Sequence, residues 1–278
     1  MDHKTQVARA EALRRMHDRR SVLLLPNAWD AASARLFAER GFRAIATTSG
    51  GVAWALGYAD GEAAPLEEIL AAVRRIVRVV DVPVTVDFET GYGAAPADVA
   101  ESIRAVIAAG AAGVNLEDST PGHGPLRSAG DAAARIRAAR DTAKVAGIPL
   151  VINARVDNWL HAPGDHAAPL ADATTRTRAY LAAGADCVYP IGLSDRETIK
   201  ALVEALDAPV NVMAGAGTPP LAELARLGVA RVSTATWFAA LALGTVDRAA
   251  RAVLTSGGFD ALATDFNYMD AQHLFAAR

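Results

Sequence analysis

Short apolar runs alternate with longer amphipathic stretches along the whole chain, and most runs follow one of two local signals. In the first signal a glycine ends a helical stretch, as Gly110 does; in the second a proline does so, as Pro83 does. Such glycines cap helices, whereas proline both stops a helix and starts an extended segment. The stretches between the runs, such as residues 66–80 and 97–109, repeat apolar side chains at helical spacing. The runs start at Val22, Ala44, Val84, Gly113, Leu150, Asp186, Val210 and Ala230.

This pattern predicts eight strands separated by helices. Because no linker or change in composition divides the chain, we expect residues 1–278 to form a single α/β domain, a (β/α)8 TIM barrel. A doubly wound open sheet is the alternative, but eight evenly spaced units favour a closed barrel.

Composition narrows the class of partner. Apolar residues make up 52% of the chain and the formal net charge is −3, so neither a nucleic-acid surface nor an acidic tail is indicated, and we expect a small-molecule partner. The charged residues 1–21 lack the apolar core of a signal peptide, and no apolar run is long enough to span a membrane. We therefore expect no membrane association and a cytoplasmic location.

Residues 84–93 combine an apolar strand face with two acids. Val84, Val86 and Phe88 alternate with polar positions that include Asp87 and Glu89, so the strand period points both carboxylates the same way. Two adjacent like charges are costly unless a cation neutralises them, and a hard divalent metal ion is the simplest candidate. The alternative is a solvated strand end.

The ends of the neighbouring strands are also polar. Asn115 and Glu117 share one face of the fourth strand, and Asn153 and Arg155 share one face of the fifth. In a barrel these faces meet at the C-terminal mouth, where such enzymes carry their chemistry. The last three strand ends are poorer in polar residues.

Six segments together carry a family resemblance. The chain resembles the isocitrate lyase and phosphoenolpyruvate mutase superfamily over nearly its whole length. The matching segments are residues 25–30, 47–51, 56–60, 87–93, 115–118 and 153–155. The resemblance implies a barrel whose last helix is exchanged between subunits of a homodimer or homotetramer.

The resemblance also implies a ligand set. The barrel mouth is expected to bind Mg²⁺, with Mn²⁺ as a possible substitute, and a small 2-oxo or 2-hydroxy carboxylate. Asp87 would bind the metal ion, and Asp60, Glu89 and Glu117 would contribute directly or through water. Backbone N–H groups of the Ser49–Gly50 turn would donate to the substrate, and Arg155 would pair with its carboxylate. The other expected substrate-binding residues are Trp29, Thr48, Asn153 and Asn211.

One loop departs from the family pattern. Lyases of this superfamily carry a lysine and a cysteine in the loop after the fourth strand, and the mutases and phosphonopyruvate hydrolases keep a lysine and usually an asparagine or threonine. Residues 117–128 contain no lysine, cysteine or asparagine here. His123 is the residue type in this loop that titrates near neutral pH, so it is a candidate acid or base, with Asp60 and Arg155 as the other candidate catalytic residues. A solvated loop histidine is the alternative.

Three functions remain open at this level. The favoured one is a Mg²⁺-dependent lyase or decarboxylase that forms a pyruvate-enolate-like intermediate. The second is a phosphorus–carbon mutase or hydrolase, and the third is a barrel that binds a 2-oxo acid without turnover. Arg155 is also ambiguous, because a permanent ion pair with Glu117 or Asp157 would equally explain its place.

Overall fold

The strands form one closed parallel barrel. The computed structural model describes residues 1–162, 164 and 167–276. Strands β2 to β7 pair in chain order, while β8, β9 and β1 form a second sheet in which β9 is central. A bridge between Val188 and Val210 joins β7 to β8, and β1 continues into β2 across Pro26. The strands are β1 (Leu23–Leu25), β2 (Asn27–Ala28), β3 (Ile45–Thr47), β4 (Val84–Asp87), β5 (Gly113–Glu117), β6 (Val151–Val156), β7 (Cys187–Pro190), β8 (Asn211–Met213) and β9 (Arg231–Ser233).

The predicted barrel is therefore confirmed, with one difference. The first predicted strand divides into β1 and β2, because Pro26 has no N–H to donate to a ladder. Its carbonyl still accepts a hydrogen bond from the Ala46 N–H, at 3.0 Å. The two pieces pair with different neighbours: β1 with β9 and β2 with β3.

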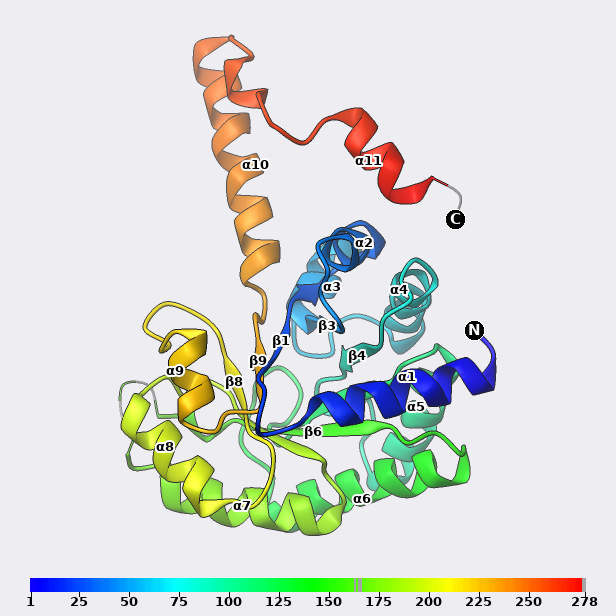
Figure 1. The fold of residues 1–278 in the computed structure, drawn as a ribbon, viewed down its shortest axis with the longest axis vertical. Helices are drawn as coiled ribbons and strands as arrows, with labels where there is room; N and C mark the ends of the chain where they lie inside the picture. The colour runs from blue at the N-terminus through cyan, green and yellow to red at the C-terminus, as the bar shows by residue number, and fades with distance from the viewer. Residues whose placement is uncertain (163, 165–166, 277–278) are drawn as a thin grey trace.

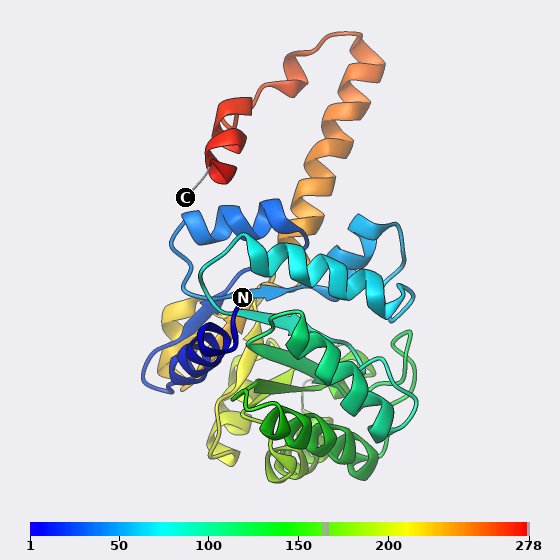
Figure 2. The ribbon, with the colours of Figure 1, turned by 90° about the vertical axis from the view of Figure 1, so that its right-hand side faces the viewer.

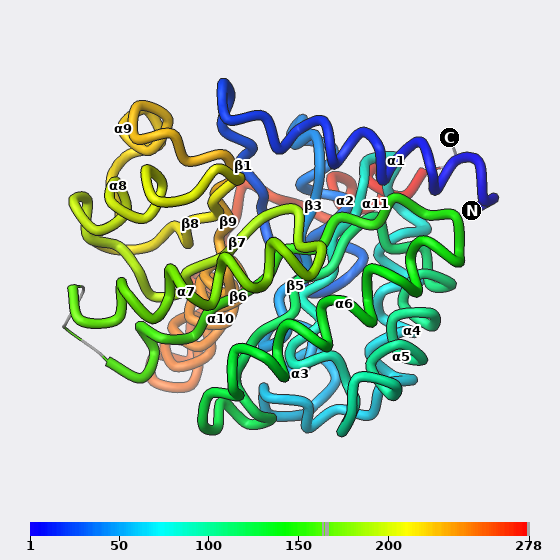
Figure 3. The backbone as a smooth tube through the Cα atoms, turned by 90° about the horizontal axis from the view of Figure 1, so that it is seen from below, coloured from blue at the N-terminus to red at the C-terminus, as the bar shows by residue number. Residues whose placement is uncertain are grey.

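Helices surround the strands, as the view from below shows (Figure 3). The helix α4 buries Ile69, Val73 and Ile76 along one stripe and exposes charged residues on the other side. It and α5 match the predicted helices to within two residues at each end. The surrounding helices are α2 (Ala31–Glu39), α3 (Ser49–Leu56), α4 (Leu66–Arg78), α5 (Pro96–Ala108), α6 (Ala129–Val145), α7 (Leu170–Ala183), α8 (Arg196–Ala205) and α9 (Leu221–Arg226).

Helix α1 (His3–Met16) packs on the barrel with Ala10 and Leu13 fully buried. The Gln6 side chain ties it to the end of α5 and to the loop before β5 by donating to the Ile107 and Ala111 carbonyls, at 2.7 and 3.0 Å. The short 3₁₀ helix η1 (Asn158–Leu160) follows β6.

The C-terminal arm leaves the barrel. Helix α10 (Trp237–Ser256) projects away from it, and the chain then passes η2 (Asp260–Leu262) and returns to α11 (Tyr268–Phe275) beside α2 (Figures 1 and 2). Apolar side chains on α10 are strongly exposed: Leu241 is 61% and Val246 66% exposed. Among the described helices, none has the length and apolar character to cross a membrane.

Candidate active site

The N-terminus of α3 faces the barrel mouth. Thr48 caps the helix by accepting the Gly51 N–H at 3.4 Å, and Ser49 and Gly50 form the buried first turn. A helix N-terminus presents unpaired N–H groups and a partial positive charge. Here the Asp87 carboxylate binds at this N-terminus. Its Oδ2 atom accepts hydrogen bonds from the backbone N–H of Ser49 at 3.2 Å and from the Ser49 hydroxyl at 3.0 Å. The same groups can bind another anion.

Asp87 ends β4, and a buried amide fixes its second oxygen. The Asn115 Nδ2 atom donates to Asp87 Oδ1 at 3.4 Å. Its own oxygen accepts from Asn153 Nδ2 at 2.9 Å and from Arg231 Nη2 at 3.2 Å. Because these two donors hold the amide oxygen, the amide nitrogen is directed at Asp87.

Glu89 lies just beyond the strand rather than on it. Strand β4 ends at Asp87, and Glu89 takes the left-handed conformation with φ = 49°. Its carboxylate accepts from the Tyr92 hydroxyl and the Glu62 N–H, both at 2.5 Å. Burial raises the pKa of Glu89 to about 7, with a further contribution from the charge of Asp87. The strand alternation therefore stops two residues before Glu89, although the acid still lies near Asp87.

Arg155 joins two buried acids. Its Nη1 lies 2.6 Å from Glu117 Oε2, and its Nε and Nη2 donate to Asp157 at 2.6 and 3.1 Å. Burial opposes the charged forms, and it raises the pKa of Glu117 even against the Arg155 charge. The two carboxylates raise the pKa of Arg155. The ion pair of Arg155 that the sequence offered as an alternative is therefore present, with Glu117 and with Asp157.

Two loops bring Asp60 and His123 together. The His123 Nε2 lies 3.4 Å from Asp60 Oδ2, while Asp60 Oδ1 is buried and has no hydrogen-bond partner among the described residues. The loops touch through Gly61 and Gly122: the Gly122 N–H donates to the Gly61 carbonyl at 3.1 Å. A Cβ on Gly61 would lie 2.7 Å from Gly122 Cα, so this approach requires glycine.

These groups surround one cavity of about 320 Å³ at the C-terminal ends of the strands. Its lining includes Ser49, Asp60, Asp87, His123 and Arg155. It also includes four apolar side chains from the end of β8 or from the segments after β6, β7 and β9: Leu160, Ile191, Met213 and Ala235. The polar and charged residues of this lining can bind an anion and a cation side by side.

Comparison with known proteins identifies the family. The model of the phosphoenolpyruvate phosphomutase family matches residues 13–254. The chain belongs to this family. An oxaloacetate decarboxylase of Paraburkholderia xenovorans is 33% identical over 73% of this chain and 68% of its own.

Two solved structures extend the comparison. A Burkholderia cenocepacia J2315 protein, provisionally described as a lyase/mutase, has a TM-score of 0.91 and 39% identity over 99% of this chain and 98% of that one. Oxaloacetate acetylhydrolase with its product oxalate has a TM-score of 0.85 and 25% identity over 95% and 93% of the two chains. The predicted membership of the isocitrate lyase and phosphoenolpyruvate mutase superfamily is confirmed, and with it the enzyme class of carbon–carbon lyases and mutases.

Several predicted site residues of this family member lie beside or below the cavity. Trp29 lines a separate apolar groove with Trp54 and Leu243 of α10. Asn153 and Asn211 are fully buried beneath the mouth, where Asn211 donates to the Ser233 hydroxyl at 3.1 Å. Glu89 and Glu117 are buried behind Asp87 and Arg155, and Gly50 lies close to Asp60.

Some supporting residues were not predicted from the sequence. Glu62 holds the turn after β4 by accepting the N–H groups of Thr90 and Tyr92, both at 2.9 Å. Asp118 accepts from the Tyr180 hydroxyl at 2.7 Å and from the Asp157 N–H at 2.9 Å. Asp157 was considered from the sequence as a partner of Arg155, whereas Glu62 reaches the turn after β4 from a different loop.

The mouth fits Mg²⁺ held mainly through water. Among the described residues, no three His, Cys, Asp or Glu side chains already converge as metal ligands. Mg²⁺ usually keeps several waters and takes only one or two carboxylates. Asp87, with its carboxylate in the cavity, and Asp60, with its unpartnered buried oxygen, fit that requirement.

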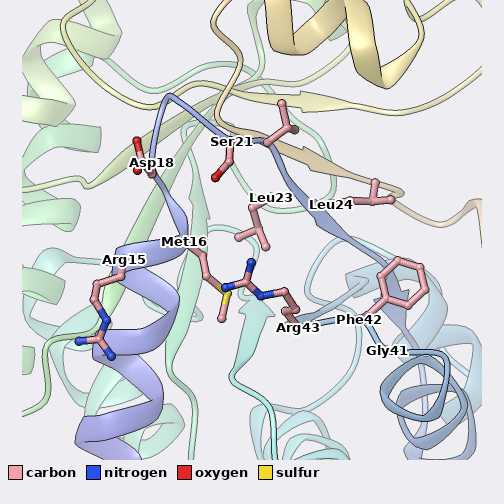
Figure 4. Close-up of a pocket in the computed structure, with 10 residues that line it drawn as sticks. Arg15, Met16, Asp18, Ser21, Leu23, Leu24, Gly41, Phe42 and Arg43 are labelled. Carbon is pink, nitrogen blue, oxygen red and sulfur yellow. The ribbon is translucent and has the colours of Figure 1, made fainter.

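A second cavity of about 300 Å³ lies at the other end of the barrel, beside the end of α1 and the start of β1 (Figure 4). Arg15, Asp18 and Arg43 are its charged residues. Asp18 pairs with the exposed Arg20 at 2.9 Å, so no group there resembles the arrangement around Asp87.

Proposed function

We propose that this protein is a Mg²⁺-dependent lyase-type enzyme that acts on a small 2-oxo or 2-hydroxy carboxylate through a pyruvate-enolate-like intermediate. The observation that carries this proposal is the convergence of the α3 N-terminus, Asp87 and Arg155 on one cavity. It offers an anion site beside an acid-rich cation site, as a 2-oxo acid with a divalent metal ion requires.

Asp87 would hold the metal ion, with Asp60, Glu89 and Glu117 acting through water. The bound metal ion would supply positive charge to stabilise the developing enolate. With Asp87 holding the metal ion, the Ser49 N–H would be available to the substrate carboxylate or enolate oxygen.

Arg155 would orient the substrate. A guanidinium has five N–H donors, and two of those of Arg155, on Nε and Nη2, donate to Asp157. The donors left on Nη1 and Nη2 can form a planar fork with a carboxylate. Because the two acids hold the guanidinium rigidly, the fork is oriented before the substrate arrives.

His123 would move the proton. Its Nε2 faces Asp60 at the cavity wall, and its side chain is 44% exposed, so it can exchange protons with both the substrate and solvent. This role takes the place of the lysine and cysteine that the loop lacks.

The relatives include both chemistries, because the family model is that of a phosphoenolpyruvate phosphomutase while other relatives carry out carbon–carbon reactions. One relative is an oxaloacetate decarboxylase, and a solved relative is an oxaloacetate acetylhydrolase with oxalate bound. The loop lacks the lysine and asparagine of the phosphonate enzymes, and it also lacks the lysine and cysteine of the isocitrate and methylisocitrate lyases. We therefore favour decarboxylation, or cleavage of another small 2-oxo or 2-hydroxy acid, over all of these reactions. By the family resemblance, we also propose a homodimer or homotetramer in which α10 and α11 are exchanged, which would cover the exposed face of α10.

A substrate panel tests the reaction. Oxaloacetate, 2-methyl-substituted malates and phosphonopyruvate would be supplied with Mg²⁺ or Mn²⁺ while pyruvate and inorganic phosphate are measured. We expect pyruvate from one of the first two classes and no reaction with excess chelator. Phosphate release from phosphonopyruvate would favour the mutase or hydrolase alternative, and binding without any turnover would favour a binding protein.

A further inference from the structure

The cavity has two chemically different walls. Ser49 begins α3 just after β3, Asp60 lies in the loop after α3, and Asp87 ends β4. Ile191 and Met213 belong to the ends of β7 and β8. In the closed order of the barrel these two pairs of strands lie opposite one another. A ligand held at the α3 N-terminus therefore extends toward the apolar side.

The apolar wall offers no cation among the described residues that line the cavity. Arg155 is the one permanent cation of that lining and is already shared with Glu117 and Asp157. The polar groups on the apolar side are hydroxyls, Tyr189 and Ser233 below and Thr236 near the rim. The Ser233 hydroxyl accepts a hydrogen bond from the Asn211 amide at 3.1 Å.

A carboxylate placed against this wall would lose hydration without gaining a counter-charge. An alkyl group placed there would gain about fourfold in affinity for each buried methylene. Leu160, Ile191 and Met213 carry no side-chain hydrogen-bonding group that would hold a ligand. The wall therefore separates charged from uncharged ligand groups, and not one hydrogen-bonding pattern from another.

We propose that Leu160, Ile191 and Met213 select a substrate that carries a short uncharged alkyl branch beyond its reacting carboxylate groups, and that they exclude a further carboxylate at that position. This inference rests on the proposed function, since it takes the 2-oxo acid to be anchored at Ser49 and Arg155. It assigns the substrate to the branched dicarboxylic or 2-oxo acids rather than to the tricarboxylic acids.

Binding of a matched ligand pair tests the selection. The ligands 5-methyl-2-oxohexanoate and 2-oxoglutarate differ in ending with an isopropyl group or a carboxylate of similar shape. In calorimetric titrations with saturating Mg²⁺, we expect the isopropyl ligand to bind at least tenfold more tightly. Equal binding, or tighter binding of 2-oxoglutarate, would overturn the inference.

Oxalate separates this inference from the proposed function. Oxalate carries the anchoring group without any branch, so it should bind whether or not the apolar wall selects. Oxalate binding without the preference for the isopropyl ligand would overturn the selection alone. Failure of oxalate to bind would overturn the proposed function and this inference together.

A charge placed on the wall provides the complementary test. Met213→Lys should reverse the preference, so that 2-oxoglutarate gains at least tenfold while oxalate affinity changes less than twofold. Leu221→Lys on α9 is the matched control, because Leu221 is 43% exposed and does not line the cavity. Leu160→Lys, at a position that is 42% exposed, repeats the test with less risk to folding. An unchanged preference in both cavity variants would contradict the inference.

Discussion

Two buried arginines lie in the same barrel under opposite conditions. At the mouth, Arg155 contacts two carboxylates, of Glu117 and Asp157. Deeper inside, Arg231 on β9 is fully buried, and no described carboxylate forms an ion pair with it. Its contacts are the Asn115 oxygen at 3.2 Å and His17 Nε2 at 3.5 Å, and its Nε has no hydrogen-bond partner among the described residues.

This difference between Arg155 and Arg231 shows which of the buried charged groups can change partners when a ligand binds. Burial and the nearby Arg231 lower the pKa of His17 to about 4, so His17 is a neutral neighbour. Burial lowers the pKa of Arg231, whereas the two acids raise that of Arg155. Asn115 connects the regions, because it accepts from Arg231 and donates to Asp87. The mouth can exchange its contacts for a metal ion and a substrate, while the deeper cation has no such alternative.

The most severe test removes the metal ligand of the mouth. Asp87→Ala should abolish Mg²⁺ binding and turnover, because the small hard ion loses its direct carboxylate. Calorimetric titration of Mg²⁺ and the pyruvate assay would measure this. Asp207→Ala, which removes only an exposed partner of Arg19, is the control. Full turnover in excess chelator would contradict a metal requirement.

Removing each arginine in turn tests the comparison directly. Arg155→Met should destabilise the protein by about 3–5 kcal/mol, because Glu117 and Asp157 would remain buried without a counter-charge. Arg231→Met should be neutral or stabilising by about 1–4 kcal/mol, because it removes a buried charge that no acid compensates. Denaturant unfolding of both variants would measure the free energies. Equal destabilisation would show that Arg231 is as well compensated as Arg155.

A conservative change separates charge from geometry at the mouth. Arg155→Lys should leave Mg²⁺ bound and the fold intact, yet weaken oxalate or pyruvate binding by about 1.5–3 kcal/mol. Lysine keeps the charge but cannot contact Glu117, Asp157 and a planar carboxylate at once. Calorimetry with both ligands would decide. Unchanged carboxylate affinity would leave Arg155 with a structural role alone.

The smallest expected effect is a dependence on pH. The pKa of Glu89 is about 7 in the folded protein and about 4.5 when unfolded. Its proton therefore contributes stability that is fully present below pH 4.5 and is lost as the pH rises through 7. Mg²⁺ favours the ionised acid, so its affinity should fall by up to about tenfold per unit below pH 7. Titrations at pH 6, 7 and 8 would measure the slope, and Glu89→Gln should flatten it. If Mg²⁺ affinity depended on pH as steeply in Glu89→Gln as in the wild-type protein, the titrating proton would belong to a group other than Glu89.

Local signals predicted the barrel well. Glycine caps and X-Pro pairs act on neighbouring residues, so they located all eight predicted strands and the helices α4 and α5. They did not predict the division of the first strand, which depends on which strands flank Pro26. Nor did they end β4 before Glu89, whose left-handed turn depends on bonds from Tyr92 and Glu62.

The candidate site was predictable in part for the same reason. Strand period and family motifs pointed to Ser49, Asp87 and Arg155, which do line one cavity. The pairing of Arg231 with Asn115 and His17 joins residues 116 and 214 positions apart, and only barrel closure brings them together. The apolar wall was equally hidden, because Leu160, Ile191 and Met213 carry no motif.

Under the proposed helix exchange, the groove at the base of α10 would couple assembly to ligand binding. Trp29, Gly51 and Leu243 line that groove, and Gly51 follows directly after the Ser49–Gly50 turn that faces the substrate. Under the proposed helix exchange, anything that reshapes the groove also shifts this turn, so dilution would lower the specific activity. By linkage, a ligand held by that turn would in turn tighten the oligomer by the same factor. The protein's own concentration would then act as an effector of its active site.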